Sequence, residues 1–253
     1  MIRMILTDLD HTLLREDGSV SPETVRVIAA CRAKGVLFAI ATALYWIGAE
    51  RYIELLRPDY EITTDGTLVT SQDRCVYSCA FSERETAFLL RRLLRETGGA
   101  EITVAVGKQV YWNSRHIAES AKLHKAVYND YSEDLHVNAN KIVAGLPDEG
   151  IARRIANEAG CGLQCYRGEK WYAFLPRGAG KTTAVRSLAQ ACGIGMEEIA
   201  AFGDDSNDID MLKACGTGIA VANAVPEALA AADAVTLSNE EDGVARWLKD
   251  HLL

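Results

Sequence analysis

Two short stretches of this 253-residue sequence, DLDHT near its start and GDDSND after residue 202, concentrate acidic side chains that could bind a metal ion. Asp8 and Asp10 are two positions apart after a short apolar run, so in an extended backbone they project to the same side. Carboxylates gathered within a few ångströms repel one another, and a divalent cation relieves that repulsion. Magnesium prefers carboxylate oxygens and shares its coordination with phosphate groups, so this residue set predicts Mg²⁺ as the cofactor.

Lys181 adds a cation to these carboxylates. It lies in LPRGAGKTTAV, where glycines precede Lys-Thr at a predicted helix start, as in a nucleotide-binding loop. That loop also requires a glycine at the position of Leu175, where a side chain obstructs close approach of the backbone to phosphate. An ammonium beside the free N–H groups of a helix start still suits a phosphate of some kind. By itself, however, a Gly-Lys-Thr sequence is more typical of a solvated lysine after a turn.

Strands and helices alternate on either side of these residues. The runs MIRMILTD, VLFAIAT and DYEITTDG have the character of buried strands, and SPETVRVIAACRAKG between the first two is a helix with Ser21 as its N-cap. After residue 180 the alternation returns, with IAAFGD, GIAV and AVTL as strands. This order predicts an α/β fold with a Rossmann-like parallel sheet that is covered by helices on both faces.

Polar residues follow several of these core strands at their carboxyl ends, where open α/β sheets bind ligands. Each of them alone could be a helix cap or a turn hydroxyl. Their joint occurrence favours a single site instead. In chain order, the candidate residues are Asp8, Asp10, Thr42, Asp65, Gly66, Lys181, Asp204, Asn207 and Asp208.

Residues 81–177 have a different order of predicted elements. A helix is expected over about 83–97, a hairpin around Gly107, a second helix over 148–159 and a further strand pair around Gly168. Helices combined with hairpins indicate an α+β domain. We therefore expect residues 81–177 to form a cap inserted into a discontinuous core of residues 1–80 and 178–253.

In combination, these motifs resemble those of haloacid dehalogenase-like (HAD) phosphohydrolases, and in particular the magnesium-dependent, Cof-like sugar-phosphatase branch with a large α/β cap (type IIB). The resemblance covers nearly the whole chain. DLDHTLL matches the nucleophile loop of the family, ATA at residues 41–43 its second motif, Lys181 its third and GDDSNDIDM its fourth. The first and last of these motifs are specific by themselves, whereas the other two gain meaning only in combination.

The resemblance also implies roles for individual residues. Asp8 would be the nucleophile that forms an aspartyl-phosphate, and Asp10 would be the general acid and base. Thr42 and Lys181 would hold the phosphoryl oxygens, and Asn207 would complete the substrate site. Magnesium would be held by the metal-site residues Asp8, Asp10 (through its carbonyl), Asp204 and Asp208. We expect selection of the leaving group to depend on the cap and on Asp65 and Gly66, in a loop that faces it.

The sequence departs from the family pattern at two places. Thr42 is followed by Ala43 and Leu44, where relatives usually carry Gly-Arg, so an arginine that could reach the cap or substrate is missing. His11 stands where relatives often have glycine, and we expect it to face away from the chemistry. The first departure leaves the particular substrate open without affecting the expectation of phosphoryl transfer.

Composition and charge argue against several classes of protein. The net charge of −8, without clusters of Lys and Arg, argues against a nucleic-acid-binding surface. Neither a signal peptide nor a transmembrane segment is evident, so we expect a cytoplasmic protein with no membrane partner and reduced cysteines. The pairs Cys75/Cys79 and Cys161/Cys165 have a spacing that could supply zinc ligands, but they lack the glycine-rich turns of zinc knuckles.

The leading hypothesis is a magnesium-dependent phosphatase whose partner is a small phosphorylated metabolite, a sugar phosphate or similar, and which is a monomer or homodimer. A phosphomutase can use the same aspartate pair and stays an alternative. A non-catalytic phosphosugar-binding module is a weaker one, because Asp8 and Asp10 are both present. The substrate is not identified by the sequence. Four aromatic residues of the cap could contact it, although aromatics on short strands are usually core: Tyr111, Trp112, Trp171 and Tyr172.

Overall fold

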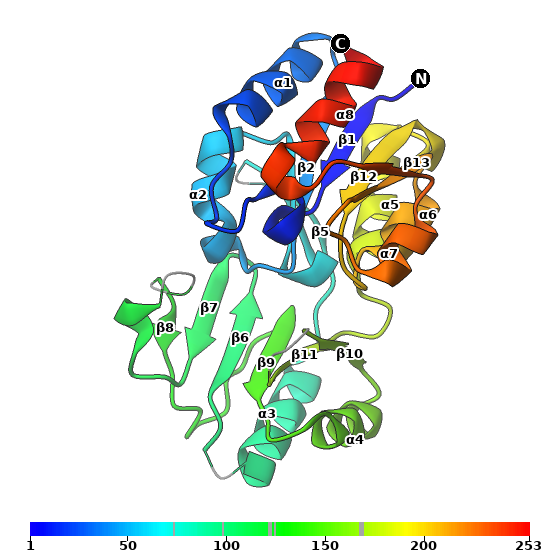
Figure 1. Cartoon of the computed structure of the whole chain (residues 1–253). Coiled ribbons are helices and arrows are strands. Elements are labelled where there is room, and N and C mark those ends of the chain that lie inside the picture. Colours follow the sequence, from blue (N-terminus) through cyan, green and yellow to red (C-terminus); the bar gives the residue numbers. More distant parts are fainter. Residues whose placement is uncertain (73, 98, 121–122, 124, 167–169) are drawn as a thin grey trace. The chain divides into compact units, whose positions relative to one another are not determined.

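The computed structural model describes the chain except for residues 73, 98, 121–122, 124 and 167–169, and it contains two compact units (Figure 1). The first unit comprises Met1–Ala43, Arg51–Tyr77 and Lys181–Leu253. The second comprises Leu44–Glu50 and Ser78–Gly180. Helix α2 (Trp46–Leu56) therefore contributes its first residues to the second unit and the others to the first. The second unit thus includes a segment, Leu44–Glu50, that lies outside the insertion expected from the sequence.

The first unit is built on an eight-stranded sheet with the order β14-β13-β12-β1-β2-β3-β4-β5. The pairs from β14 to β3 are parallel, as the sequence predicts, whereas β4 runs antiparallel to β3 after a tight turn. The strands are β1 (Met4–Thr7), β2 (Leu37–Ala41), β3 (Tyr60–Thr63), β4 (Leu68–Ser71), β5 (Arg74–Ser78), β12 (Ile199–Gly203), β13 (Thr217–Val221) and β14 (Ala234–Thr236).

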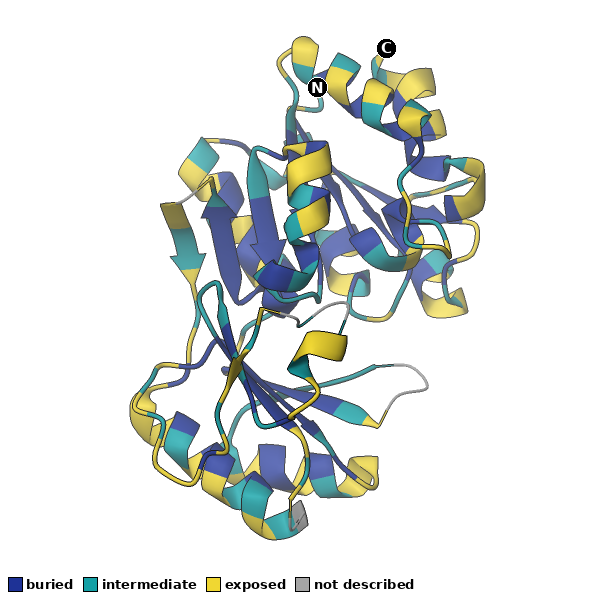
Figure 2. Ribbon diagram, turned by 90° about the vertical axis from the view of Figure 1, so that its left-hand side faces the viewer, coloured by how far each residue is buried: buried dark blue, intermediate teal, exposed yellow. Residues whose placement is uncertain are grey.

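Helices cover both faces of this sheet, which explains why its central strands read as continuous apolar runs. Helices α1 and α8 pack against each other, and α5, α6 and α7 form a second group (Figure 1). Figure 2 shows the central strands as almost entirely buried. The helices are α1 (Pro22–Ala33), α5 (Lys181–Cys192), α6 (Ile209–Ala214), α7 (Pro226–Ala231) and α8 (Gly243–Leu252).

The second unit has a six-stranded sheet with the order β10-β11-β9-β6-β7-β8. Its pairs are antiparallel except for β7 and β8. Helices α3 (Glu83–Thr97) and α4 (Glu149–Ala159) pack together beside it (Figure 1). The strands are β6 (Ile102–Val106), β7 (Gln109–Trp112), β8 (Val127–Tyr128), β9 (Lys141–Gly145), β10 (Gly162–Cys165) and β11 (Trp171–Leu175). Gly168, around which the last strand pair was expected, lies outside the described residues.

Successive residues along the strands of this second sheet point to its two opposite faces. Val104, Ile142 and Phe174 belong to a buried apolar cluster with residues of α3 and α4, so they define the helix-covered face. On the opposite face, Ala105 and Val110 pack with Ile47. Among the aromatic residues considered as ligand contacts, Trp112 and Tyr172 are buried, and Tyr111 and Trp171 are half-buried. No helix in the described part of the chain is long and apolar enough to cross a membrane.

Candidate active site

Asp8 begins the site directly after β1. Its backbone N–H donates to the carbonyl of Phe202 in β12 (3.0 Å), which joins the carboxyl ends of the two neighbouring strands. The chain then turns through Leu9–Leu13, with His11 in the left-handed region (φ 60°) and exposed. The His11 carbonyl accepts a hydrogen bond from the side chain of Asn223 (2.7 Å). Asp8 is buried in this turn and only 6% exposed.

Asp204 and Asp208 enter the site from the turn between β12 and α6. Asp208 is fully buried, and its Oδ2 accepts hydrogen bonds from the backbone N–H groups of Asp204 (3.1 Å) and Asp205 (3.3 Å). The absence of a side chain at Gly203 permits this close approach, because a Cβ atom there would lie 2.5 Å from the Asp208 Cβ. The turn is therefore shaped around the Asp208 carboxylate.

Lys181 connects the acidic residues of β1 with those of the α6 turn. It is the first residue of α5 and is 4% exposed, and its Nζ donates to Asp8 Oδ1 (2.7 Å) and to Asp208 Oδ1 (2.6 Å). Burial alone would lower the pKa of Lys181, but the two carboxylates outweigh it and raise the pKa well above its usual range. The side chain is therefore a fixed cation.

Three carboxylates form the candidate metal site. Asp8, Asp204 and Asp208 each offer an oxygen, and these oxygens lie within 4.8 Å of one another. Burial raises the pKa of Asp204 to about 6 and raises that of Asp8 well above its usual range, although Lys181 lowers the latter. Buried, mutually repelling carboxylate oxygens are a donor set that fits Mg²⁺. Among the described residues no other group of three His, Cys, Asp or Glu side chains has this geometry.

Thr12 belongs to the site but is absent from the set of residues predicted from sequence. It is buried, and its hydroxyl donates to Asp204 Oδ1 (2.7 Å), which orients this carboxylate. Its place in the motif DLDHT, four positions after Asp8, is the signal that could have identified it. Asp10 lies in the same turn and is half-buried, and its side chain is not part of the three-carboxylate group. The metal contact expected of Asp10 involves its backbone carbonyl and stays a prediction.

The remaining predicted residues lie in the same unit. Thr42 follows β2 and is fully buried, and its carbonyl accepts a hydrogen bond from the backbone N–H of Asp65 (3.3 Å). Asp65 and Gly66 are buried in the turn between β3 and β4, which packs against α5. Asn207 is half-buried in the turn before α6. Contacts between side chains thus join Asp8, Lys181 and Asp208. Asp204 is joined to Asp208 through its backbone N–H and to Thr12 through its side chain, and Thr42 and Asp65 are joined through the backbone.

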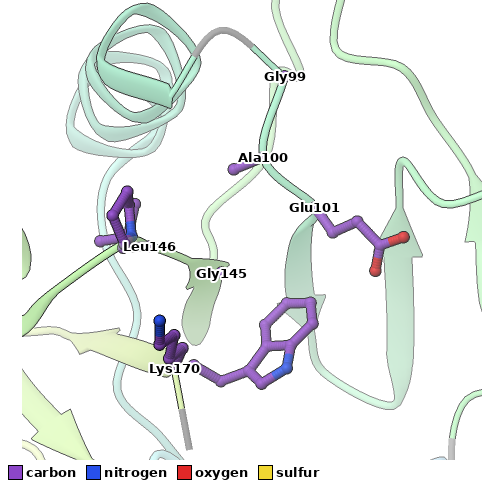
Figure 3. Close-up of a pocket in the computed structure, with 8 residues that line it drawn as sticks. Gly99, Ala100, Glu101, Gly145, Leu146 and Lys170 are labelled. Carbon is purple, nitrogen blue, oxygen red and sulfur yellow. The ribbon is translucent and has the colours of Figure 1, made fainter.

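A hollow of about 490 Å³ in the second unit is separate from these residues (Figure 3). Lys170, Trp171 and Glu101 line it together with Gly145, over which the indole ring of Trp171 lies. Trp171 is one of the aromatic residues considered above as possible substrate contacts, whereas none of the residues predicted for the phosphate and metal site lines the hollow. Among the described residues that line it, Glu101 is the one carboxylate, so the cluster of Asp8, Asp204 and Asp208 is the stronger candidate for an active site.

Comparison with known proteins gives a family match over most of the chain. Residues 5–248 match the family of haloacid dehalogenase-like hydrolases. The phosphatase YwpJ of Bacillus subtilis is 49% identical over 100% of this chain and 100% of its own length. A second Bacillus subtilis protein, 5-amino-6-(5-phospho-D-ribitylamino)uracil phosphatase YitU, is 23% identical over 98% of this chain and 97% of its own.

Solved structures share the fold of this chain. A haloacid dehalogenase-like hydrolase from Bacteroides thetaiotaomicron has a TM-score of 0.84 at 22% identity, with 99% of both chains covered. A HAD subclass IIB sugar phosphatase, BT4131, has a TM-score of 0.84 at 20% identity, with 98% of both chains covered. At these identities the likeness is one of fold.

Proposed function

The chain belongs to the haloacid dehalogenase-like hydrolases and is a phosphatase, and we propose that it hydrolyses a small phosphorylated metabolite through an aspartyl-phosphate on Asp8. The observation that carries this proposal is the buried Lys181 ammonium, which bonds to both Asp8 and Asp208. An ammonium at this position can hold both the nucleophilic carboxylate and an incoming phosphoryl oxygen. The pairing is therefore suited to phosphoryl transfer.

The proposed reaction has two chemical steps. In the first, an Asp8 carboxylate oxygen attacks phosphorus, the bond between phosphorus and the ester oxygen breaks, and Asp10 donates a proton to the departing alcohol. In the second, Asp10 accepts a proton from water, the water oxygen attacks phosphorus, and the Asp8–phosphorus bond breaks to release inorganic phosphate. Lys181 and Thr42 hold the phosphoryl oxygens through both steps.

The same residues bear on the proposed dependence on magnesium. Asp8 must be ionised to attack, yet burial raises its pKa well above the usual range, and Lys181 only partly opposes this. Asp8, Asp204, Asp208 and the backbone carbonyl of Asp10 would hold the ion. Magnesium at this position would favour the ionised form of Asp8 and neutralise charge on the phosphoryl group. Thr12 would keep the Asp204 carboxylate turned toward the ion.

The experiment that tests the proposed function measures inorganic phosphate released from a panel of phosphorylated metabolites. We expect release with MgCl₂ and none after exhaustive treatment with EDTA, with recovery when Mg²⁺ is restored. A phosphomutase would instead return the phosphoryl group to a second hydroxyl of the same molecule, which phosphorus NMR of the product detects. Undiminished phosphate release in EDTA would contradict magnesium dependence, and isomerisation without release would favour the mutase.

A further inference from the structure

The turn that connects β3 to β4 contains three consecutive residues in the left-handed region of backbone conformation. The φ angles are 59° at Thr64, 57° at Asp65 and 83° at Gly66. Glycine adopts such angles readily, but a β-branched threonine at positive φ is a true outlier. Strained residues of this kind persist where the surrounding structure enforces them, and they concentrate at ligand-binding and catalytic sites.

Two buried hydroxyl groups lie in this strained turn or directly before it. Thr63 and Thr64 are 0% exposed, and neither Oγ1 atom has a hydrogen-bond partner within the part of the chain that the structure describes. Nearby threonines differ, because the Thr67 hydroxyl donates to the Thr64 carbonyl (2.7 Å) and the Thr70 hydroxyl donates to Glu61 (2.5 Å). A buried hydroxyl without a partner is destabilising, so two adjacent ones in a strained turn indicate a role other than stability.

The turn lies at the carboxyl-terminal ends of the parallel strands, where the proposed catalytic residues also lie. Strands β1, β2 and β3 are neighbours and parallel, so Asp8, Thr42 and Thr63 all follow or end strands at the same edge. The Asp65 N–H donates to the Thr42 carbonyl, which fixes the turn beside the residue proposed to hold phosphoryl oxygens. The turn also packs against α5, the helix that begins with Lys181.

We propose that the Thr63 and Thr64 hydroxyls, together with the Asp65 carboxylate, bind neutral hydroxyl groups in the alcohol part of the substrate. This inference rests on the proposed phosphatase function. A threonine hydroxyl both donates and accepts hydrogen bonds, and a carboxylate accepts them, so the set matches the alcohol groups of a polyol. A second anionic group in the substrate would be repelled by Asp65. The turn therefore selects phosphorylated polyols over esters whose alcohol part is apolar or anionic.

The test compares the full-length variants Thr63→Val, Thr64→Val and Thr67→Val with the wild type. Valine keeps the branched shape and replaces the hydroxyl with a methyl group. Sorbitol 6-phosphate serves as the polyol ester and p-nitrophenyl phosphate as an ester without alcohol groups. We expect Thr63→Val and Thr64→Val to raise KM for sorbitol 6-phosphate about three- to tenfold, because each variant loses one neutral hydrogen bond to the substrate. Neither should change KM for p-nitrophenyl phosphate.

Thermal unfolding supplies a second measurement that does not need turnover. Both variants should have a higher Tm than the wild type without ligand, because a buried hydroxyl without a partner has been removed, whereas Thr67→Val should have a lower Tm. Sorbitol 6-phosphate should raise the Tm of the wild type more than that of Thr64→Val.

Two outcomes would overturn the inference, and a third would bear on the proposed function. Unchanged KM for sorbitol 6-phosphate in both variants, with raised Tm, would overturn the inference by showing that the substrate does not contact these hydroxyls. Equal effects on both esters would overturn it as well, because the alcohol part would not be what they bind. If the wild type hydrolysed neither ester, the panel of metabolites would decide the proposed function, and the ligand-induced rise in Tm would still decide the inference.

Discussion

Lys181 is the residue on which the proposed site depends most directly, because it offsets the repulsion between buried carboxylates. Replacing it by Met should abolish phosphate release and lower the free energy of unfolding at neutral pH by about 3–5 kcal/mol, as when a buried ion pair is broken. Lys213→Met, an exposed lysine on α6, is the control and should behave as the wild type. Chemical denaturation and phosphate assays measure both effects, and a stable, active Lys181→Met protein would contradict the assignment.

Asp204 makes the stability of the metal-free protein depend on pH. Burial raises its pKa to about 6 from an ordinary value of 3.8, so the folded protein binds more protons than the unfolded chain between these values. The contribution of Asp204 to the free energy of unfolding in EDTA should therefore fall as the pH rises through this window, by at most about 3 kcal/mol. Burial also raises the pKa of Asp8, which adds to the fall. A divalent cation favours the ionised carboxylate, so MgCl₂ should stabilise the protein more near neutral pH than near pH 4. Equal stabilisation at both would count against the site.

The sequence predicted some site residues and missed others for a physical reason. Asp8, Lys181, Asp204 and Asp208 stand directly after strands or at a helix start, so the order of elements alone is enough to bring them together. The contact of Thr12 with Asp204 depends on how a turn folds across to another strand. The left-handed turn at Thr64 likewise has no local sequence signal apart from the following Asp-Gly.

At the level of elements, the turn from β12 into α6 depends on a glycine. A Cβ atom at Gly203 would lie 2.5 Å from the Cβ of Asp208, whose carboxylate is held by Lys181 and two backbone N–H groups. Gly203→Ala should displace Asp208, lower phosphate release at least about tenfold and destabilise the fold by about 1–3 kcal/mol.

Gly162→Ala is the matched control for this substitution. Its added Cβ atom would make only ordinary contact, with the nearest atom, the Leu175 carbonyl oxygen, at 3.5 Å. Activity and thermal stability close to those of the wild type are therefore expected. If Gly203→Ala were equally harmless, the close packing of Asp208 against β12 would not matter to the site.

Most elements of the fold could be predicted because their hydrophobic periodicity and capping residues are clear in the sequence. Helices α3 and α4 agree with their predicted segments to within one residue, α5 begins at the predicted lysine, and the β6–β7 hairpin forms around Gly107. Strand β4 was missed because it directly follows a compact turn that ends the preceding strand. The two-residue strand β8 lies in a stretch without periodicity, and only its pairing with β7 defines it.

At the level of the whole molecule, we predict that the inserted residues 81–177 supply the choice of substrate. Replacing them with a short linker should weaken selection among phosphorylated metabolites, while some hydrolysis of p-nitrophenyl phosphate survives. Ile47 packs with Ala105 and Val110 of the second unit, so the truncated protein should also carry Ile47→Gln to remain soluble. An identical substrate ranking for a folded truncation and the wild type would show that the insertion does not select substrates.

The central claim, covalent phosphoryl transfer through Asp8, is tested most directly by the turnover of Asp8→Asn with p-nitrophenyl phosphate and MgCl₂. The amide keeps the shape of the side chain but is a poor nucleophile. Asp210→Asn, an exposed aspartate on α6, serves as the control, and circular dichroism confirms that both variants are folded. We predict turnover at the background rate for Asp8→Asn and near the wild-type rate for Asp210→Asn. Folded Asp8→Asn protein with turnover close to that of the wild type would contradict the mechanism.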